Sequence, residues 1–246
     1  MTGAMTGRLR VASYNIHACV GGDGRCDPAR IAAVLREIDA DVIGLQEVDV
    51  RPGETDDSMQ MHYLAAALGH HAISGPTLKR FSGHYGNALL TRRPVLEVRH
   101  IDLTVYRREP RAALDVDLDI DGSPVRVIVT HLGLLPGERR TQVRLLLDRL
   151  GESGSEIVIL CGDINEWFAI GRPLRWLHAR LGRSEGIPTF PAAFPVFALD
   201  RIWVHPRATL EGLTAHASPE ARRASDHLPV LADLRLGSGA RPQSRI

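Results

Sequence analysis

The chain repeatedly follows an apolar, strand-like run with a short polar end, and this pattern limits what it can fold into. Each run ends where apolar residues give way to Asn, Asp, Glu or His. The five polar ends are Ser13-Tyr14-Asn15, Leu45-Gln46-Glu47, Val129-Thr130-His131, Gly162-Asp163-Ile164-Asn165 and Ser225-Asp226-His227-Leu228-Pro229. Since α/β folds keep their chemistry at strand ends, the series predicts one metal-binding hydrolytic site assembled from across the chain.

Both helices and strands are predicted along the sequence, with four strands in succession between residues 88 and 130. Apolar residues recur at helical spacing over residues 28–38 and 137–150, and again over 63–68 before Gly69. Strands are predicted at 11–16, 41–46, 88–91, 95–103, 112–120, 125–130, 157–161, 199–204 and 228–234. Residues 186–195, which are rich in proline and aromatic residues, are expected to form a long loop near the site. The predicted helices and strands, together with the polar strand ends, fit one α/β domain.

One predicted strand carries an acidic residue at every second position. Asp115, Asp117 and Asp119 alternate with apolar residues, which is typical of a strand with one face toward solvent. We therefore expect these three aspartates on the surface rather than in a metal site.

Length and composition set outer limits on the fold and its partners. The 246 residues are 44% hydrophobic and 24% charged, which suits one globular domain. We expect a single domain over residues 8–236, with flexible tails at 1–7 and 237–246. The formal net charge of +1 argues against a chain built mainly to coat nucleic acid, although residues 75–111 form a candidate basic surface.

The cysteines and the N-terminus bear on location. Cys19, Cys26 and Cys161 are odd in number and lack the spacing of a zinc site, which fits a reducing compartment. Residues 1–10 contain no signal-peptide pattern, and no segment has the roughly 20 apolar residues that span a bilayer. We expect a cytoplasmic monomer without an integral membrane segment.

Oxygen-bearing side chains at two strand ends indicate a hard metal ion. Asn15 and Glu47 offer an amide and a carboxylate, and Mg²⁺ or Mn²⁺ prefers such ligands together with water and phosphate oxygens. His131 and His227 lie far apart in the sequence. This arrangement suits one histidine acting on the attacking water and the other acting on the phosphate.

Three more residues fit the same chemistry. Asp163 and Asn165 are two positions apart, so in an extended segment both side chains point to one side. A turn would account for the same Asp-x-Asn pattern, because Asp and Asn both favour turns. Asp200 stands between apolar residues, which indicates a buried carboxylate that needs a partner, and a histidine is the expected one.

Taken in order, the motifs resemble those of the endonuclease/exonuclease/phosphatase superfamily, which includes deoxyribonucleases, apurinic endonucleases, sphingomyelinases and inositol polyphosphate 5-phosphatases. The matching stretches are Ser13-Tyr14-Asn15-Ile16, Leu45-Gln46-Glu47-Val48, Tyr85-Gly86-Asn87-Ala88-Leu89-Leu90, Thr130-His131-Leu132, Gly162-Asp163-Ile164-Asn165, Leu199-Asp200-Arg201-Ile202 and Ser225-Asp226-His227-Leu228-Pro229. The resemblance implies a four-layer α/β sandwich, in which two packed mixed β-sheets are flanked by helices.

The resemblance also implies which residues bind metal and substrate. Glu47 would be the main metal carboxylate, with Asn15 beside it and Asp226 at this metal or a second one. His17 stands where apurinic endonucleases of this type carry an aspartate, which puts a carboxylate-rich second site in doubt. We count His17 and Asn87 among the residues that contact the substrate.

For the reaction itself the resemblance implies five residues. His227, oriented by Asp200, would be the general base or the stabiliser of the pentacoordinate phosphorus. Asp163 and Asn165 would position the nucleophile and the phosphate, and His131 would donate to a nonbridging oxygen.

The segment Arg108-Glu109-Pro110-Arg111 resembles the one where deoxyribonucleases place a phosphate-contacting arginine, and either Arg108 or Arg111 fits that role. The predicted activity is therefore Mg²⁺- or Mn²⁺-dependent hydrolysis of a phosphodiester, which could be phospholipid-derived, a small molecule or nucleic acid. A DNA endonuclease or exonuclease that uses the basic surface of residues 75–111 is the first alternative. A non-catalytic binding module on the same fold is the second.

Overall fold

The computed structural model describes residues 7–49, 60–80, 83–151 and 155–237, and its strands form two sheets. The first sheet has the order β10-β11-β1-β2-β4-β3, and the second has the order β5-β6-β7-β8-β9. The first comprises β10 (Leu210–Ala215), β11 (Val230–Leu236), β1 (Gly7–Asn15), β2 (Val42–Asp49), β4 (Gly83–Thr91) and β3 (His71–Arg80). The second comprises β5 (Val95–Asp102), β6 (Ala112–Ile120), β7 (Ser123–His131), β8 (Ile157–Asp163) and β9 (Asp200–His205).

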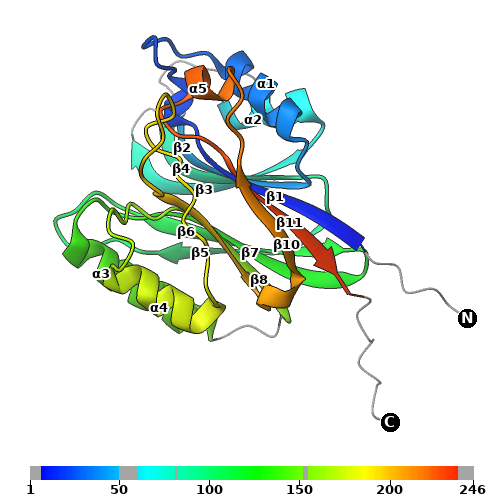
Figure 1. Cartoon of the computed structure of the whole chain (residues 1–246), viewed down its shortest axis with the longest axis vertical. Coiled ribbons are helices and arrows are strands. Elements are labelled where there is room, and N and C mark those ends of the chain that lie inside the picture. Colours follow the sequence, from blue (N-terminus) through cyan, green and yellow to red (C-terminus); the bar gives the residue numbers. More distant parts are fainter. Residues whose placement is uncertain (1–6, 50–59, 81–82, 152–154, 238–246) are drawn as a thin grey trace, which may run out of the picture.

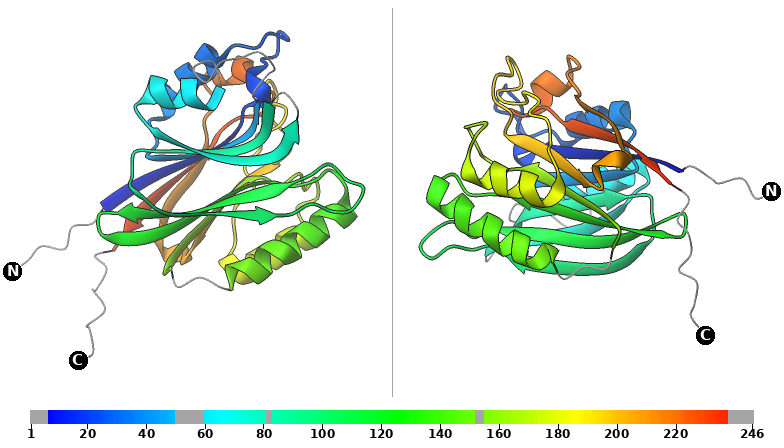
Figure 2. Two further views of the ribbon diagram at one scale, coloured as in Figure 1. Left: turned by 180° about the vertical axis from the view of Figure 1, so that it is seen from behind. Right: turned by 60° about the horizontal axis from the view of Figure 1, so that its bottom comes forward.

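Helices cover the outer face of each sheet, so the molecule has four layers (Figure 1). On the first sheet lie α1 (Pro28–Ile38), α2 (Gln60–Leu68) and the short α5 (Ala221–Ala224); on the second lie α3 (Pro136–Leu150) and α4 (Arg172–Leu181). Figure 2 shows the two sheets face to face between these helices. Each sheet contains one parallel pair, β1 with β2 and β7 with β8, among antiparallel neighbours. The predicted four-layer sandwich of mixed sheets is confirmed.

Local chemistry explains the helix predicted at 28–38. Oδ1 of Asp27 accepts the backbone N–H of Arg30, and Pro28 occupies the first turn, where its missing N–H has no cost. Asp39 ends the helix in the left-handed region. The apolar face of the helix, which includes Ile31 and Leu35, is fully buried against the first sheet.

Four strands and α-helices of the described chain were not predicted: β3, β10, α4 and the short α5. β1 also begins earlier than expected, so the expectation of a flexible tail is wrong at Gly7, which pairs with Leu236. Gly237 follows the last strand, and the rest of both predicted tails lies outside the described residues. Within the described part of the chain, no helix is both long and apolar enough to cross a bilayer.

The expected surface position of Asp115 is wrong. Its side chain is buried, and its carboxylate accepts hydrogen bonds from Arg126 at 2.6 and 2.9 Å and from Arg99 at 3.1 and 3.2 Å. Burial alone would raise the pKa of Asp115, but the two arginines outweigh it and hold that pKa below its ordinary value. Asp117 and Asp119 are partly exposed.

Replacing Asp115 with asparagine is expected to lower the free energy of unfolding by about 3 kcal/mol at pH 7, since Arg126 would stay buried without its counter-ion. Because the pKa of Asp115 is lowered in the folded protein, its stabilisation is complete above the unfolded-state pKa of about 4 and is lost as the pH falls through the folded-state value. Urea unfolding at pH 7 and pH 3 measures this, with the exposed Asp148→Asn as control. Equal effects of the two substitutions would contradict it.

Candidate active site

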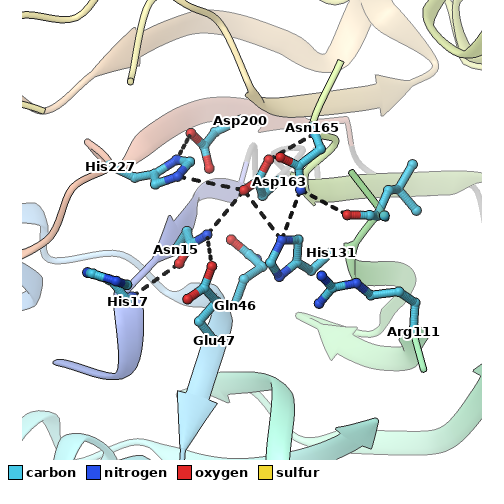
Figure 3. Close-up of polar contacts among 12 residues, drawn as sticks. Asn15, His17, Gln46, Glu47, Arg111, His131, Asp163, Asn165, Asp200 and His227 are labelled. Atoms are coloured by element: carbon cyan, nitrogen blue, oxygen red, sulfur yellow. Dashed lines mark hydrogen bonds and ion pairs between the residues drawn. The ribbon is translucent and has the colours of Figure 1, made fainter. Parts of the chain in front are cut away.

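Strand ends from both sheets meet at one end of the sandwich. β1 and β2 run parallel, so Asn15 aligns with Gln46, next to Glu47. β7 and β8 also run parallel, and His131 aligns with Asp163. Nδ2 of Asn15 donates to Oδ2 of Asp163 at 3.1 Å, and this hydrogen bond joins the two sheets (Figure 3). The structure thus brings these predicted residues together.

Asp163 is the buried acid on which the surrounding side chains converge. Besides the bond from Asn15, its Oδ2 lies 3.6 Å from Nε2 of His131 and 3.7 Å from Nε2 of His227. Its Oδ1 accepts the backbone N–H of Asn165 at 2.9 Å. Burial raises the pKa of Asp163 above its ordinary value, against the opposing effect of the two imidazoles. Both imidazole distances exceed a direct hydrogen bond and suit a bridging water or phosphate oxygen.

Unusual backbone conformations place three of these groups. Gly162 has φ +146°, and a Cβ at this position would lie 1.8 Å from the carbonyl oxygen of Thr130, so only glycine fits before Asp163. Glu47 and Asn165 have φ angles of 57° and 52°, in the left-handed region that residues other than glycine rarely adopt. Such strain clusters at functional sites, where the surrounding structure holds it.

Asp200 and His227 form the pair that the apolar flanks of Asp200 predicted. Nδ1 of His227 lies 2.8 Å from Oδ2 of Asp200, and the hydroxyl of Thr189 donates to the same oxygen at 2.5 Å. Burial disfavours the charged imidazole, but the charge and hydrogen bond of Asp200, together with the charge of Asp163, raise the pKa of His227 to about 10. The Phe190 ring packs 4.9 Å from the His227 ring. Nε2 is thereby directed toward Asp163.

His131 lies on the other side of Asp163. The amide of Asn165 contacts Nε2 of His131 at 3.0 Å and donates to the carbonyl oxygen of Leu132 at 2.9 Å. Burial is the main reason that the pKa of His131 is lowered to about 4, and the positive charge of Arg111 adds to it. A neutral ring accepts from Asn165 through Nε2. The predicted donation from His131 to a phosphate oxygen therefore requires this contact to change.

The two candidate arginines differ in their surroundings. Arg111 is buried and lies beside His131 (Figure 3), and its Nη2 donates to Glu109 at 3.1 Å. Among the described atoms, Nε of Arg111 has no hydrogen-bond partner. Arg108 is exposed. Of the two, only Arg111 is placed among the site residues.

Glu47 is the candidate metal carboxylate. It is half-buried, and its Oε1 accepts the amide of Asn15 at 2.9 Å. The oxygen of Asn15 accepts the backbone N–H of His17 at 3.1 Å, so in this arrangement Asn15 orients Glu47 rather than offering an oxygen of its own. One partly exposed carboxylate beside buried polar side chains fits Mg²⁺ or Mn²⁺, which retain waters and take substrate oxygens.

A second cluster could be read as a metal site but is better explained otherwise. Asp163, Asp200 and His227 present three ligand atoms within 4.8 Å of one another. Since Nδ1 of His227 is hydrogen-bonded to Asp200 and both acids are buried, the cluster has the geometry of a histidine held and oriented by carboxylates.

The remaining predicted residues lie around this centre. The carboxylate of Asp226 is 3.7 Å from Nδ1 of His17 and accepts the hydroxyl of Ser225 at 3.4 Å. Nδ2 of Asn87 donates to the carbonyl oxygen of Ala112 at 2.9 Å, which links the two sheets. Its buried Oδ1 has no partner among the described atoms and could accept from a ligand.

Several residues that support the site escaped the sequence analysis. Thr189 lies in the loop expected near the site, but nothing in that loop's composition singles out its bond to Asp200. Ser225 was seen only as part of a motif, and its hydroxyl donates to the carbonyl oxygen of Asn15 at 2.7 Å. The buried Arg139 contacts Glu166 at 3.4 Å and donates to the carbonyl oxygen of Leu134 at 2.6 Å. It ties together the segments that follow β7 and β8.

Comparison with known proteins gives consistent matches. The model of the "Endonuclease/Exonuclease/phosphatase family" matches residues 12–227. "Uncharacterized protein YbhP" of Escherichia coli (strain K12) is 31% identical over 245 residues, covering 93% of this chain and 96% of that protein. Among solved structures, an endonuclease/exonuclease/phosphatase from Beutenbergia cavernae DSM 12333 is similar with a TM-score of 0.79 and 28% identity, over 94% of this chain and 72% of that one.

A more distant structure shows the same fold. The human Nocturnin catalytic domain, solved with a bound sulfate anion, has a TM-score of 0.69 and 20% identity, over 92% of this chain and 93% of that one. The family match spans nearly all of the described sandwich, including every strand end that builds the site. The chain belongs to the endonuclease/exonuclease/phosphatase family.

Proposed function

We propose that this protein is a phosphodiesterase that uses Mg²⁺ or Mn²⁺ to hydrolyse a phosphodiester by in-line attack of water. Members of its family are hydrolases of phosphoester bonds. The observation that carries the finer assignment is the convergence of Asn15, His131 and His227 on one oxygen of Asp163. A buried acceptor surrounded by nitrogen groups suits the activation of a water molecule next to a phosphate.

In the proposed reaction, Asp163 accepts a proton from the attacking water. The water oxygen bonds to phosphorus as the bond from phosphorus to the leaving alcohol oxygen breaks, and the alkoxide takes a proton from solvent. The imidazole of His227 is held by the hydrogen bond that its Nδ1 donates to Asp200, and its Nε2 donates to a nonbridging oxygen of the phosphorane. A divalent ion at Glu47 would neutralise charge that develops on the phosphorane and the leaving oxygen.

Two further groups are assigned to the phosphate. Arg111, with its unpartnered Nε, is placed to donate to phosphate oxygens. The Asn165 amide, now shared between His131 and Leu132, can turn to the phosphate and free His131 to donate as predicted. We assign contacts with the rest of the substrate, or with a second metal, to three residues at the edge of the site: Asn87, His17 and Asp226.

A DNA nuclease is the second candidate function. The arginines in and after β5 favour it, but Arg99 is engaged by Asp115 and Asp117 and so is not free for phosphates. A non-catalytic module is disfavoured because the acids and histidines of the site are all present. We place the protein in the cytoplasm as a monomer, since an odd number of cysteines without the spacing of a zinc site fits a reducing compartment. Cell fractionation and light scattering would check these two assignments.

The proposal is tested by hydrolysis of bis(p-nitrophenyl) phosphate against p-nitrophenyl phosphate, with Mg²⁺, with Mn²⁺ and with EDTA. We expect faster cleavage of the diester, no activity in EDTA, and loss of activity in His227→Ala. Arg111→Met should raise KM at least about tenfold, whereas the exposed Arg108→Met should leave KM unchanged. Diester cleavage that persists in EDTA would contradict the proposed mechanism. So would diester cleavage that persists in His227→Ala when the thermal midpoint is unchanged.

A further inference from the structure

Large apolar side chains stand out into solvent around one end of the five-stranded sheet. Tyr106, Ile170 and Phe194 are 82%, 84% and 76% exposed. They are accompanied by Leu134, Phe168 and Val196, which are also exposed. We call these six residues the apolar rim. Single exposed apolar residues are common, but a collection around a site marks an interaction surface.

Sheet topology places all six at the same end. β7 and β8 end at this end, so the segments after them, which carry Leu134, Phe168 and Ile170, lie there too. β6 and β9 run antiparallel to these strands and begin at the same end. The segments before them therefore lie there as well, with Tyr106 ahead of β6 and with Phe194 and Val196 ahead of β9.

Aromatic contacts connect the rim to the candidate active site. The ring of Phe190 packs 4.9 Å from that of His227, and the ring of Trp167 lies 5.8 Å from that of Phe190. Trp167 also packs 4.8 Å from Phe197, which is partly exposed between Val196 and the site. These ring contacts therefore connect His227, through Phe190 and Trp167, to Phe197, which is next to Val196 of the rim in the sequence.

The rim is held in place by buried polar groups. Glu166, just before Trp167 and Phe168, is buried and paired with Arg139, and its Oε1 accepts the backbone N–H of Phe168 at 3.2 Å. Arg139 also fixes the carbonyl oxygen of Leu134. Burying these two charges is costly without a positioned partner. The segment is therefore presented outward by a fixed arrangement and does not fold back onto the core.

Exposed arginines adjoin the apolar rim in the sequence. Arg107 and Arg108 adjoin Tyr106, and Arg172 follows Ile170 in the next segment. Two exposed acids of these segments, Glu109 and Glu185, are paired with Arg111 and Arg207. Residues 186–199, which carry Phe194 and Val196, contain no charged residue. Apolar side chains flanked by arginines complement a surface that is apolar inside and anionic outside.

We propose that the apolar rim docks on a phospholipid bilayer that contains anionic lipids, with the active site facing the headgroups. Aliphatic Leu134, Ile170 and Val196 can enter the acyl boundary but cannot stack on bases, which makes a bilayer a better fit than single-stranded nucleic acid. The inference rests on the proposed function in one respect: the scissile diester would then be that of a lipid headgroup. Docking itself needs no turnover.

Co-sedimentation with vesicles tests this directly. Full-length protein is mixed with vesicles of phosphatidylcholine, with or without phosphatidylglycerol, and with single-stranded oligonucleotide in a parallel gel-shift assay. We expect binding to the anionic vesicles, weaker binding to pure phosphatidylcholine, and at least about tenfold weaker binding of the double variant Ile170→Ser, Phe194→Ser. Arg107→Ser with Arg108→Ser should weaken binding to the anionic vesicles at least about fivefold and have little effect on pure phosphatidylcholine.

Leu96→Ser is the matched control, because Leu96 is 57% exposed on the edge strand β5, outside these segments. Equal loss of binding in Leu96→Ser and in the rim variant would overturn the proposal, and so would no sedimentation of the wild type with either vesicle. Rim variants that weaken oligonucleotide binding and leave vesicle binding intact would assign the surface to nucleic acid. Since sedimentation does not depend on catalysis, His227→Ala should sediment like the wild type, which separates this inference from the proposed function.

Discussion

Replacing Asp163 with asparagine is expected to lower kcat for diester hydrolysis by roughly a thousandfold, the scale of losing a positioned proton acceptor. Asparagine has almost the same shape and can still accept the backbone N–H of Asn165 through its oxygen. It cannot take a proton from water, and it removes the charge that Asn15, His131 and His227 surround. The loss should therefore fall on kcat, with KM changed much less.

Steady-state kinetics on the p-nitrophenyl diester measures this effect, and a thermal melt of the same sample checks the fold. Asp148→Asn, an exposed carboxylate on α3, is the matched substitution and should retain full activity. A drop of less than tenfold in Asp163→Asn would show that another group accepts the proton. The role proposed for Asp163 would then be wrong, although the family assignment would stand.

Replacing Glu47 with glutamine is expected to abolish activation by Mg²⁺ or Mn²⁺, with a fall in activity of roughly a thousandfold at metal concentrations that saturate the wild type. Glutamine keeps a side-chain oxygen for the Asn15 amide but lacks the negative charge that a hard divalent cation prefers. Activity as a function of metal concentration gives the first measure. Calorimetric titration with Mn²⁺ gives a second that needs no turnover.

Asp226→Asn is the informative companion to Glu47→Gln. The Asp226 carboxylate contacts His17 and Ser225, so its loss should cost less than about tenfold if Glu47 is the main ligand. Equal defects in the two variants would support a metal shared between them or two metals. Full metal activation in Glu47→Gln would remove the proposed metal site.

The sequence was most informative where a residue's role depends on its own strand. The polar ends at Asn15, Glu47, His131 and Asp163 could be recognised because the period and termination of a strand are local properties. Parallel pairing within each sheet brings Asn15 next to Glu47 and His131 next to Asp163. The burial of Asp200 and its histidine partner could also be predicted, because a carboxylate between apolar residues has few ways of being stabilised.

Where the prediction failed, the missing information was long-range. A period of two shows which side of a strand Asp115 occupies, but not that Arg126 and α3 cover that side. The bond of Thr189 to Asp200 depends on how a long loop returns to the site. The same holds for Arg139 and Glu166, whose pairing crosses 27 positions of the chain. No local pattern encodes such contacts.

The order of strands in the first sheet has a consequence for how the protein is made. β11, the last element of the described chain, lies between β10 and β1, and His227 stands three residues before it begins at Val230. Asn15, by contrast, ends the first strand. A ribosome must therefore release the chain beyond His227 before this histidine can reach Asp163. Until then the nascent protein has Glu47 and Asp163 but no His227, so under the proposed mechanism it cannot hydrolyse a substrate.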